Sequence, residues 1–330
     1  MNQPQVSVVV ATYNRSEVLR GCLESLMNQD CEGVDYEVIL VDNNSTDDTR
    51  STVQSLLQKP GYEKLSYHFE STQGVSHARN QGISLARASI IGFTDDDIRP
   101  ARDWVASIAA GFRKFPEADC IGGKVLPDPG TKFPEWLTSR YWTPLALVDL
   151  GDNPVKLDVQ TGAGLVGANM AVRASVFAEV GLFQPQLQRV KGSIGSMEDT
   201  EFQFRASAAG KRLMYLPSLV VYAHVLEERL SKAYHRRWYC GHGHFYALMR
   251  DEGFESSRFR LFDVPGHLYR RTCASAVGWL KNRLTRQGEL EFQHELEMQF
   301  FWGFFRKRLG DRRSILRFKS GSNKNNHAPQ

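Results

Sequence analysis

The chain has 330 residues, of which 42% are hydrophobic and 24% are charged. This composition is sufficient for a full core and excludes intrinsic disorder for most of the chain. Five cysteines without a CxxC pair favour free thiols over a disulfide scaffold or a cysteine zinc site. No run of about 18 apolar residues is present, so we expect no membrane-spanning helix. We also expect no signal peptide and a cytoplasmic location.

The net charge of +4 is unevenly distributed. Residues 1–228 hold 21 basic and 28 acidic side chains, whereas residues 229–319 hold 19 basic and 9 acidic ones. The acidic part is suited to a metal ion, and the basic part to an anionic surface.

The first 125 residues alternate between buried strands and amphipathic helices. Strands are expected at 6–11, 36–42, 65–69 and 89–94, and helices at 18–29, 46–57, 76–88 and 104–115. This alternation predicts a parallel sheet covered by helices. In such sheets ligands bind beyond the carboxyl ends of the strands, so the residues that follow each strand are candidates for function.

The rest of the chain is less regular. Residues 127–160 are expected to form a long loop region with short helices. Further elements are expected as a strand at 168–172, helices at 174–179 and 197–209, and two short strands at 212–216 and 219–224 that flank Pro217. Three basic helices are expected at 230–249, 267–284 and 290–309, before a frayed tail over 320–330.

Three successive aspartates, Asp95, Asp96 and Asp97, follow the strand at 89–94. Like charges repel, and a divalent cation such as Mg²⁺ or Mn²⁺ would compensate them through oxygen ligands. The alternative is an acidic helix start in which Asp97 caps the helix that follows.

Two further positions match a nucleotide site. Asp42 ends the second strand, where a carboxylate can accept from a nucleobase or ribose. The alternative interpretation of this segment is structural: Asn44 or Ser45 caps the helix that follows. Arg79 lies in the first turns of a helix, where it can meet a diphosphate or a base edge, or can remain a solvated surface charge.

Glu198 and Asp199 open a helix after a glycine-flanked loop. Acids at this end of a helix compensate its dipole, which is the purely structural interpretation. The functional interpretation is a general base that takes a proton from an acceptor hydroxyl.

Six segments occur in an order and spacing that resemble family 2 glycosyltransferases of the GT-A fold. The resemblance covers roughly residues 5–230. The segments are VSVVVATYNR, LVDNNSTDDT, GVSHARNQGI, FTDDDIRP, GANMAVRASVF and MEDTEFQFRASAAGKRLMYLP.

The resemblance implies an inverting transfer from a nucleotide-diphosphate sugar, with uridine as the default base because it is common in the family. Thr12, Asp42 and Arg79 match positions that contact the nucleotide. Asp95 and Asp97 match the acids of the DxD motif, which bridge the ribose and the metal-bound diphosphate, and Asp96 takes the middle position in the donor site.

The same resemblance assigns the catalytic end of the site. Asp199 matches the catalytic base and Glu198 its neighbour. His224 lies where many relatives place a histidine, either as a further metal ligand or simply held at a strand end.

Trp136, Tyr141 and Trp142 in the long loop are suited to stacking on a sugar, or to packing of a lid. GAGLVG at 162–167 fits the GxGxxG pattern of dinucleotide sites, but its position after a long loop is wrong for that fingerprint. In the resemblance this stretch shapes the acceptor side of the cleft, with Asn169 near it. HRRW at 235–238 lacks the glutamine of the processive QxxRW motif, which favours a non-processive enzyme.

Arg306–Arg308 beside the aromatic run FFWGFF motivates one hypothesis for the basic helices. They would bind peripherally to an anionic inner membrane leaflet, where a lipid-linked acceptor is found. The alternative is that the aromatic side packs on the protein and the charges are solvated. No motif for nucleic-acid binding is present.

These observations predict an α/β GT-A fold with a mostly parallel sheet. A glycosyltransferase domain is expected over 1–228, a basic helical extension over 229–319 and a disordered tail over 320–330. The expected role is sugar transfer to a glycolipid or polysaccharide acceptor, with Mn²⁺ or Mg²⁺ as cofactor. The alternatives are a nucleotidyltransferase or sugar pyrophosphorylase, and a non-catalytic scaffold that binds sugar nucleotides.

Overall fold

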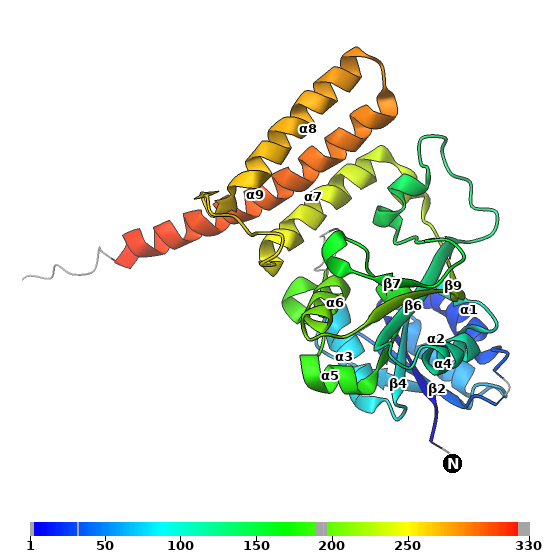
Figure 1. The fold of residues 1–330 in the computed structure, drawn as a ribbon. Helices are drawn as coiled ribbons and strands as arrows, with labels where there is room; N and C mark the ends of the chain where they lie inside the picture. The colour runs from blue at the N-terminus through cyan, green and yellow to red at the C-terminus, as the bar shows by residue number, and fades with distance from the viewer. Residues whose placement is uncertain (1–2, 32, 189–193, 195–196, 323–330) are drawn as a thin grey trace, which may run out of the picture. The chain divides into compact units, whose positions relative to one another are not determined.

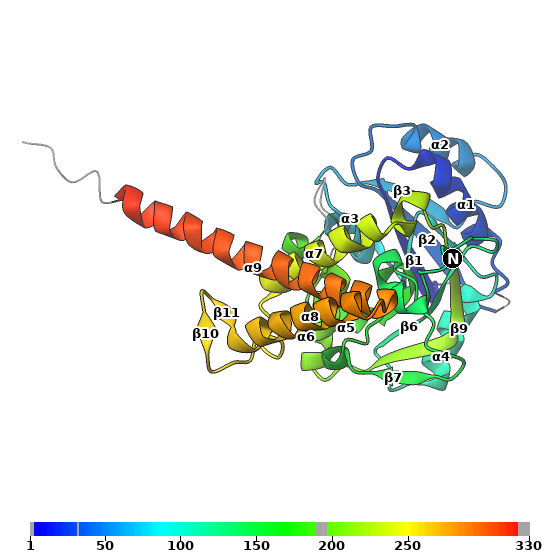
Figure 2. The same cartoon turned by 90° about the horizontal axis from the view of Figure 1, so that it is seen from above.

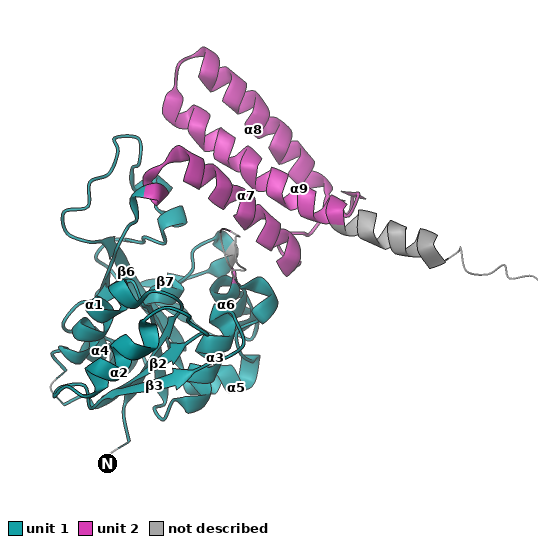
Figure 3. Ribbon diagram, turned by 180° about the vertical axis from the view of Figure 1, so that it is seen from behind, with its two compact units in different colours: residues 1–190, 198–227 teal, residues 191–197, 228–330 magenta. Residues whose placement is uncertain are grey.

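The computed structural model describes residues 3–31, 33–188, 194 and 197–322 (Figure 1). Its contacts divide the chain into two compact units (Figure 3). We call residues 1–190 with 198–227 the sheet unit, and residues 191–197 with 228–330 the helical unit. The domain limits at 228 and 319 stay a prediction, and residues 323–330 of the expected tail lie outside the described residues.

The first half of the sheet unit follows the predicted alternation. Four parallel strands lie in the order β3-β2-β1-β4. They are β1 (Val6–Thr12), β2 (Tyr36–Asp42), β3 (Leu65–Phe69) and β4 (Ile90–Asp95), and the helices between and after them are α1 (Ser16–Met27), α2 (Thr49–Leu57), α3 (Val75–Leu85) and α4 (Trp104–Lys114). β1 is buried along most of its length, as expected for a strand covered by helices on both faces.

The second half extends the sheet with antiparallel and parallel pairs. β8 (Met170–Arg173) pairs antiparallel with β4 and with β6 (Cys120–Pro127), and β6 is parallel to β9 (Leu213–Ala223). Two short strands, β5 (Ile98–Pro100) and β7 (Val155–Leu157), pair with β9. The mixed α/β class is therefore confirmed, while β5, β6 and β7 were missed in the sequence.

The two strands expected on either side of Pro217 are one strand, so this prediction was wrong. Proline lacks the N–H that a regular ladder needs, and β9 accommodates it in a bulge opposite Gly122 and Lys124. Gly123 faces this bulge, and a β-carbon there would collide with the carbonyl oxygens of Leu216 and Leu219.

Four phenylalanines fix the helix that carries two of the candidate residues. Phe93 on β4 packs with Phe177 on α5 (Ala174–Val180), with Phe183, and through these with Phe202 on α6 (Glu198–Ala208). The ring centroids of these pairs lie 5.0–6.0 Å apart. Such pairs add to the burial of apolar surface, so α6 is held firmly against the sheet.

The long loop contains short helical turns, as predicted. Tyr141 is buried, and its ring centroid lies 5.8 Å from that of Trp136. Trp142 packs near Phe133. These contacts favour the packing interpretation of the loop aromatics. The 3-10 turns of the chain are η1 (Ser139–Tyr141), η2 (Thr143–Leu145), η3 (Val159–Thr161), η4 (Gly167–Asn169), η5 (Pro185–Leu187) and η6 (Glu227–Leu230).

The described residues of the helical unit form three long helices and a small hairpin. The helices are α7 (Lys232–Met249), α8 (Gly266–Leu284) and α9 (Gly288–Ser322), and β10 (Arg260–Leu261) pairs with β11 (Val264–Pro265) before α8 (Figure 2). α9 packs on both α7 and α8. Gly243 and Gly303 allow α7 and α9 to approach closely, because a β-carbon on either would collide with backbone of the other helix. α9 extends beyond its predicted end at residue 309.

The aromatic run of α9 packs inside this unit. Phe301 and Phe304 are at most 1% exposed. Arg308 is also buried and pairs with Glu255 and Asp263. The run FFWGFF is thus mainly core, as the packing alternative expects, but Arg308 is not the solvated charge of that alternative. Within the described part of the chain, no helix combines the length and apolar character needed to span a bilayer.

His242 makes the helical unit sensitive to acid. Its ring lies 4.4 Å from that of Trp238, and burial lowers its pKa to about 4. An unfolded histidine has a pKa of about 6.5, so the unfolded chain binds this proton first as the pH falls. We expect the His242 contribution to lower the free energy of unfolding by about 3 kcal/mol between pH 6.5 and 4, measured by urea denaturation and circular dichroism as the difference between the parent protein and a variant without this histidine.

His242→Phe provides the control, because it keeps the aromatic packing and removes the titrating group. We expect the decrease over this pH range to become smaller by about the same amount. An unchanged decrease in the variant would contradict the assignment.

Candidate functional site

The site lies where the parallel strands end. Thr12 at the end of β1 is in register with Asp42 at the end of β2, and Ala11 is in register with Asp95 on β4. The pairing therefore brings three predicted donor-site residues to one edge of the sheet, as expected for ligand sites in this fold class.

Asp42 is held by two hydrogen bonds. Ser45 N donates to Oδ1 at 2.9 Å, and the Tyr67 hydroxyl donates to Oδ2 at 2.7 Å. The expected helix cap by Asn44 or Ser45 is wrong. Asp48 is the N-cap residue of α2 and makes no side-chain capping bond, while Asp47 Oδ1 accepts from the backbone N–H and the hydroxyl of Thr49.

Arg79 is a buried link between two parts of the site. Its Nη2 lies 3.0 Å from Asp95 Oδ1, and its Nη1 lies 3.1 Å from Glu198 Oε1. Burial alone would lower the pKa of Arg79, but the nearby carboxylates outweigh burial and raise it. Arg79 is therefore a permanent cation that joins β4 to the start of α6, and it is not the solvated surface charge considered above.

The position of Arg79 depends on the turn that begins α3. Gly74 precedes the helix with a φ of 139°, a conformation that other residues rarely adopt. Asn43 accepts from Gly74 N at 2.6 Å, and Gln188 accepts from Ser76 N at 2.9 Å. These bonds satisfy the N–H of the residue before the helix and one free N–H of its first turn.

Glu198 and Asp199 begin α6, as predicted, but their environments differ. Glu198 is 3% exposed and is paired with Arg79, whereas Asp199 is partly exposed. Asp199 Oδ1 accepts from Thr200 N at 2.7 Å, and Oδ2 accepts from Gly167 N at 3.1 Å. Both acids also suit the positive end of the helix dipole.

Asp96 and Asp97 share one cation, the guanidinium of Arg15. Its Nη1 lies 2.8 Å from Asp96 Oδ1 and 2.8 Å from Asp97 Oδ2. The Thr12 hydroxyl donates to the other Asp96 oxygen at 2.7 Å. Burial raises the pKa of Asp96 to about 6, although Arg15 counteracts this shift. Asp97 does not cap a helix, because β5 follows it and Asp103 precedes α4.

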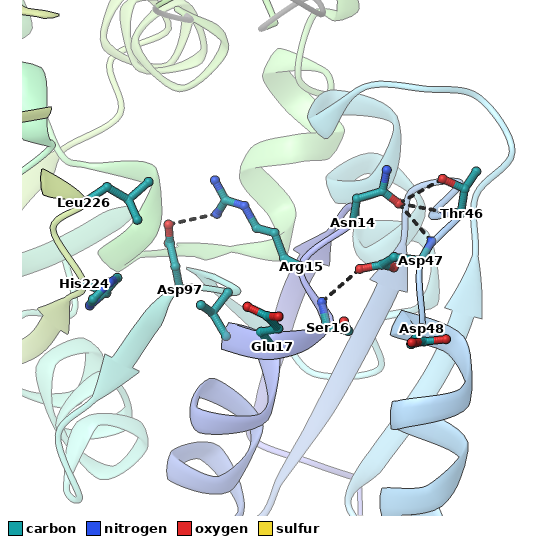
Figure 4. Close-up of a pocket in the computed structure, with 11 residues that line it drawn as sticks. Asn14, Arg15, Ser16, Glu17, Thr46, Asp47, Asp48, Asp97, His224 and Leu226 are labelled. Atoms are coloured by element: carbon teal, nitrogen blue, oxygen red, sulfur yellow. Dashed lines mark hydrogen bonds and ion pairs between the residues drawn. The ribbon is translucent and has the colours of Figure 1, made fainter. Parts of the chain in front are cut away.

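Arg15 and Asp97 also line a pocket of about 590 Å³ in the sheet unit (Figure 4). His224, at the end of β9, lies on the same pocket, and its backbone N–H donates to the Asp97 carbonyl at 3.3 Å. Its Nδ1 lies 3.4 Å from Asp128 Oδ2. His224 is thus close to the aspartates but is turned toward another acid in this structure.

The donor set is suitable for a hard divalent cation. Two carboxylates already converge on a single positive group, and a cation that replaced this group would find oxygen ligands. Among the described residues, no set of three or more histidine, cysteine, aspartate or glutamate side chains is arranged so that it could hold a metal ion by itself. Such a site would need further oxygens from a ligand, as magnesium sites commonly do.

The structure agrees with one expectation about the glycine-rich stretch and corrects another. GAGLVG does not lie between a strand and a long helix, since η3 precedes it and η4 begins at its last glycine. Asn169 is fully buried and does not face a cleft. It accepts from Trp104 Nε1 at 2.8 Å and donates to the carbonyls of Lys124 and Leu219, so it fixes the core.

The sequence reasoning missed the role of Arg15, Tyr67 and Gly167. Arg15 lies in the short segment between β1 and α1, and its place after a strand end was the available signal. Tyr67 lies within β3, and its hydroxyl reaches Asp42 only because the two strands pair. Gly167 donates to Asp199 across 32 positions of sequence, for which no local signal exists.

Gly167 leaves room for the two charged side chains beside it. A β-carbon there would lie 3.1 Å from Asp199 Oδ2 and 3.2 Å from Arg79 Nη1. We expect Gly167→Ala to lower the free energy of unfolding by about 1–3 kcal/mol in urea denaturation, as overpacking does. Gly21→Ala is the control, because a β-carbon on this α1 residue would meet nothing within 4 Å. A Gly167→Ala variant as stable as the parent protein would show that the packing is loose.

A family model described as glycosyl transferase family 2 matches residues 7–181. A PGL/p-HBAD biosynthesis glycosyltransferase of Mycobacterium bovis is 34% identical over 128 residues, which are 38% of this chain and 48% of the relative. A glucosyl-dolichyl phosphate glucuronosyltransferase of Haloferax volcanii is 29% identical over 180 residues, 54% of this chain and 55% of the relative. The chain spans about half the length of these curated relatives.

Solved structures support the GT-A fold. The mannosyltransferase PcManGT from Pyrobaculum calidifontis, solved with GDP-Man and Mn²⁺, matches with a TM-score of 0.61 at 19% identity, over 94% of this chain and 89% of that one. S. aureus TarS 1-349, solved with UDP-GlcNAc, matches with a TM-score of 0.52 at 18% identity, over 93% of this chain and 92% of that one. The family match covers more than half of the chain, and the chain belongs to glycosyl transferase family 2.

Proposed function

We propose that the protein transfers a sugar, with inversion, from a nucleotide-diphosphate sugar to a hydroxyl group of a glycolipid or polysaccharide. One observation carries this proposal most directly. Thr12, Asp42, Arg79 and the three aspartates 95–97 meet at the carboxyl edge of the sheet, beside the start of α6. That edge is where an α/β sheet of this kind binds nucleotides.

The donor nucleotide would occupy the edge formed by β1, β2 and β4. The Asp42 carboxylate provides hydrogen-bond acceptors and Thr12 provides a hydroxyl group, and both would contact the base or the ribose. Asp95, with Arg79 beside it, would contact the ribose, and Asp96 would position Asp97 through its bonds to Thr12 and Arg15. We propose a UDP-sugar as the donor, since one matched structure was solved with UDP-GlcNAc; another was solved with GDP-Man.

Asp97 would hold a divalent cation, Mn²⁺ or Mg²⁺, with Asp96 and His224 close by. When bound, this ion neutralises the charge that grows on the diphosphate leaving group. The convergence of two carboxylates on Arg15 supports the proposal, because the site already accommodates one positive charge. His224 would have to turn from Asp128 in order to serve as a ligand.

Asp199 is the proposed general base, and Glu198 is proposed to position Arg79. Asp199 is partly exposed, so its carboxylate can reach an acceptor hydroxyl, while Glu198 is buried against the arginine. The bond from Gly167 N holds the Asp199 carboxylate in place. A single displacement from the face opposite the leaving group inverts the anomeric carbon. Double displacement would need a second carboxylate as nucleophile, and we assign none.

We further propose a lipid-linked acceptor at the cytoplasmic face of a membrane. Two curated relatives point to this class by name: the glucosyl-dolichyl phosphate glucuronosyltransferase and a Campylobacter jejuni enzyme named for GalNAc(5)-diNAcBac-PP-undecaprenol. The family match favours a glycosyltransferase over the nucleotidyltransferase alternative. A non-catalytic scaffold remains as an outcome of the experiment below.

The test is donor binding and turnover by the full chain. UDP-, GDP- and dTDP-sugars are titrated by calorimetry with and without Mn²⁺, and donor hydrolysis is followed in parallel. We expect one donor to bind only with the metal and Asp97→Ala to abolish that binding. Asp199→Asn should bind the donor like the parent protein but turn it over at least about 100-fold more slowly, because general base catalysis is lost.

Glu117→Gln is the matched control, because Glu117 is exposed and lies outside the site. It should leave binding and turnover unchanged. If the parent protein and the Asp199→Asn variant both bind a donor but neither turns it over, the result would favour a non-catalytic scaffold. Failure of every sugar nucleotide to bind under either metal condition would reject the proposed donor site.

A further inference from the structure

Helix α8 reverses the usual arrangement of apolar and polar side chains. Its inner face buries Ser275 and Asn282, which are 4% and 6% exposed. On its outer face Val277, Leu280 and Leu284 are 69%, 52% and 75% exposed. A surface helix normally turns its apolar stripe to the core, so an outward stripe marks a contact surface.

The three exposed residues form one continuous stripe. Positions 277, 280 and 284 are separated by three and four residues, and side chains at these spacings lie on the same helix face. Leu268, Ser275 and Asn282, by contrast, share the opposite face and are buried. The stripe therefore covers the last two turns of α8 and is not one isolated leucine.

Nothing within the described helical unit covers this stripe. α8 packs against α9, and α9 lies between α7 and α8 (Figures 1 and 3). Ser275 donates to Glu297 of α9 at 2.6 Å, which fixes the polar face of α8 inward. The apolar face is consequently turned away from the three-helix layer.

The charge of α8 indicates what kind of surface it meets. Residues 266–284 hold four basic side chains and no acidic one. Arg271 lies over the Phe301 ring and Arg283 pairs with Glu291. Arg270 and Lys281 are exposed, and by helical spacing they lie on the same outer face as Val277. An apolar stripe flanked by cations is the pattern of a helix that lies in the interface of an anionic bilayer.

A second copy of the chain fits this face less well. Two α8 helices packed stripe to stripe would bring Arg270 and Lys281 of both copies together, with no acid on either helix to compensate them. Anionic lipid headgroups provide that compensation over the whole length of the helix.

We propose that the outer face of α8 docks the protein on an anionic lipid bilayer, with Val277, Leu280 and Leu284 inserted below the headgroups and Arg270 and Lys281 at their level. This surface replaces the FFWGFF run as the membrane contact, because the core of that run is buried. Docking needs no sugar transfer, so it stands or fails independently of the proposed activity.

The test is co-sedimentation of the full chain with phosphatidylcholine vesicles that contain or lack phosphatidylglycerol. We expect binding to the anionic vesicles, weakened by salt. Val277→Gln/Leu280→Gln/Leu284→Gln should weaken it at least about tenfold, because the insertion of three apolar side chains is lost. Arg270→Gln/Lys281→Gln should weaken it less and reduce its salt dependence.

Leu150→Gln is the matched control, since Leu150 is an exposed leucine of the sheet unit and should leave binding unchanged. Circular dichroism checks that all variants are folded. Equal binding by the triple variant and the parent protein would overturn the proposal, as would no binding of the parent protein to anionic vesicles. A parent protein that is dimeric in solution and becomes monomeric in the triple variant would assign the face to a second copy instead.

Discussion

Repulsion among acidic side chains is the constraint on which this site depends. Asp95, Asp96, Asp97, Glu198 and Asp199 gather near one edge of the sheet, and two like charges 4 Å apart near a protein surface repel by about 4 kcal/mol. Arg79 compensates one end of the cluster, between Asp95 and Glu198, and Arg15 the other, between Asp96 and Asp97. Because Arg79 joins β4 to α6, the same ion pairs also hold the proposed base in place.

Much of the sheet unit could be predicted, for a clear physical reason. The strands β1 to β4 are short apolar runs between amphipathic helices, and their limits match the predicted ranges within one residue at each end. β6 was missed because Gly122, Gly123 and Lys124 interrupt its apolar pattern. β9 was divided wrongly because Pro217 is read as a break, whereas the fold accommodates it in a bulge.

The candidate site was predictable as a set of residues but not as a set of contacts. Asp42, Asp95 and Arg79 could be named from their places after strands or at the start of a helix. Their partners could not, because Tyr67, Gly167 and Arg15 reach them only through strand pairing and long-range packing. In the helical unit, α8 was predicted as a helix, but its buried face was not. That face depends on the packing against α9, and it is the more polar one.

A divalent cation at Asp97, as proposed, would take the place that Arg15 occupies between Asp96 and Asp97. Calorimetric titration of nucleotide-free protein with Mn²⁺ tests it most directly. Arg15→Met removes the competing charge and should bind Mn²⁺ at least about tenfold more tightly, a gain of about 1.4 kcal/mol. Arg87→Met, which removes an equal charge from a pair with Glu37, should bind like the parent protein. An Arg15→Met variant that binds Mn²⁺ no more tightly than the parent protein would contradict the claim.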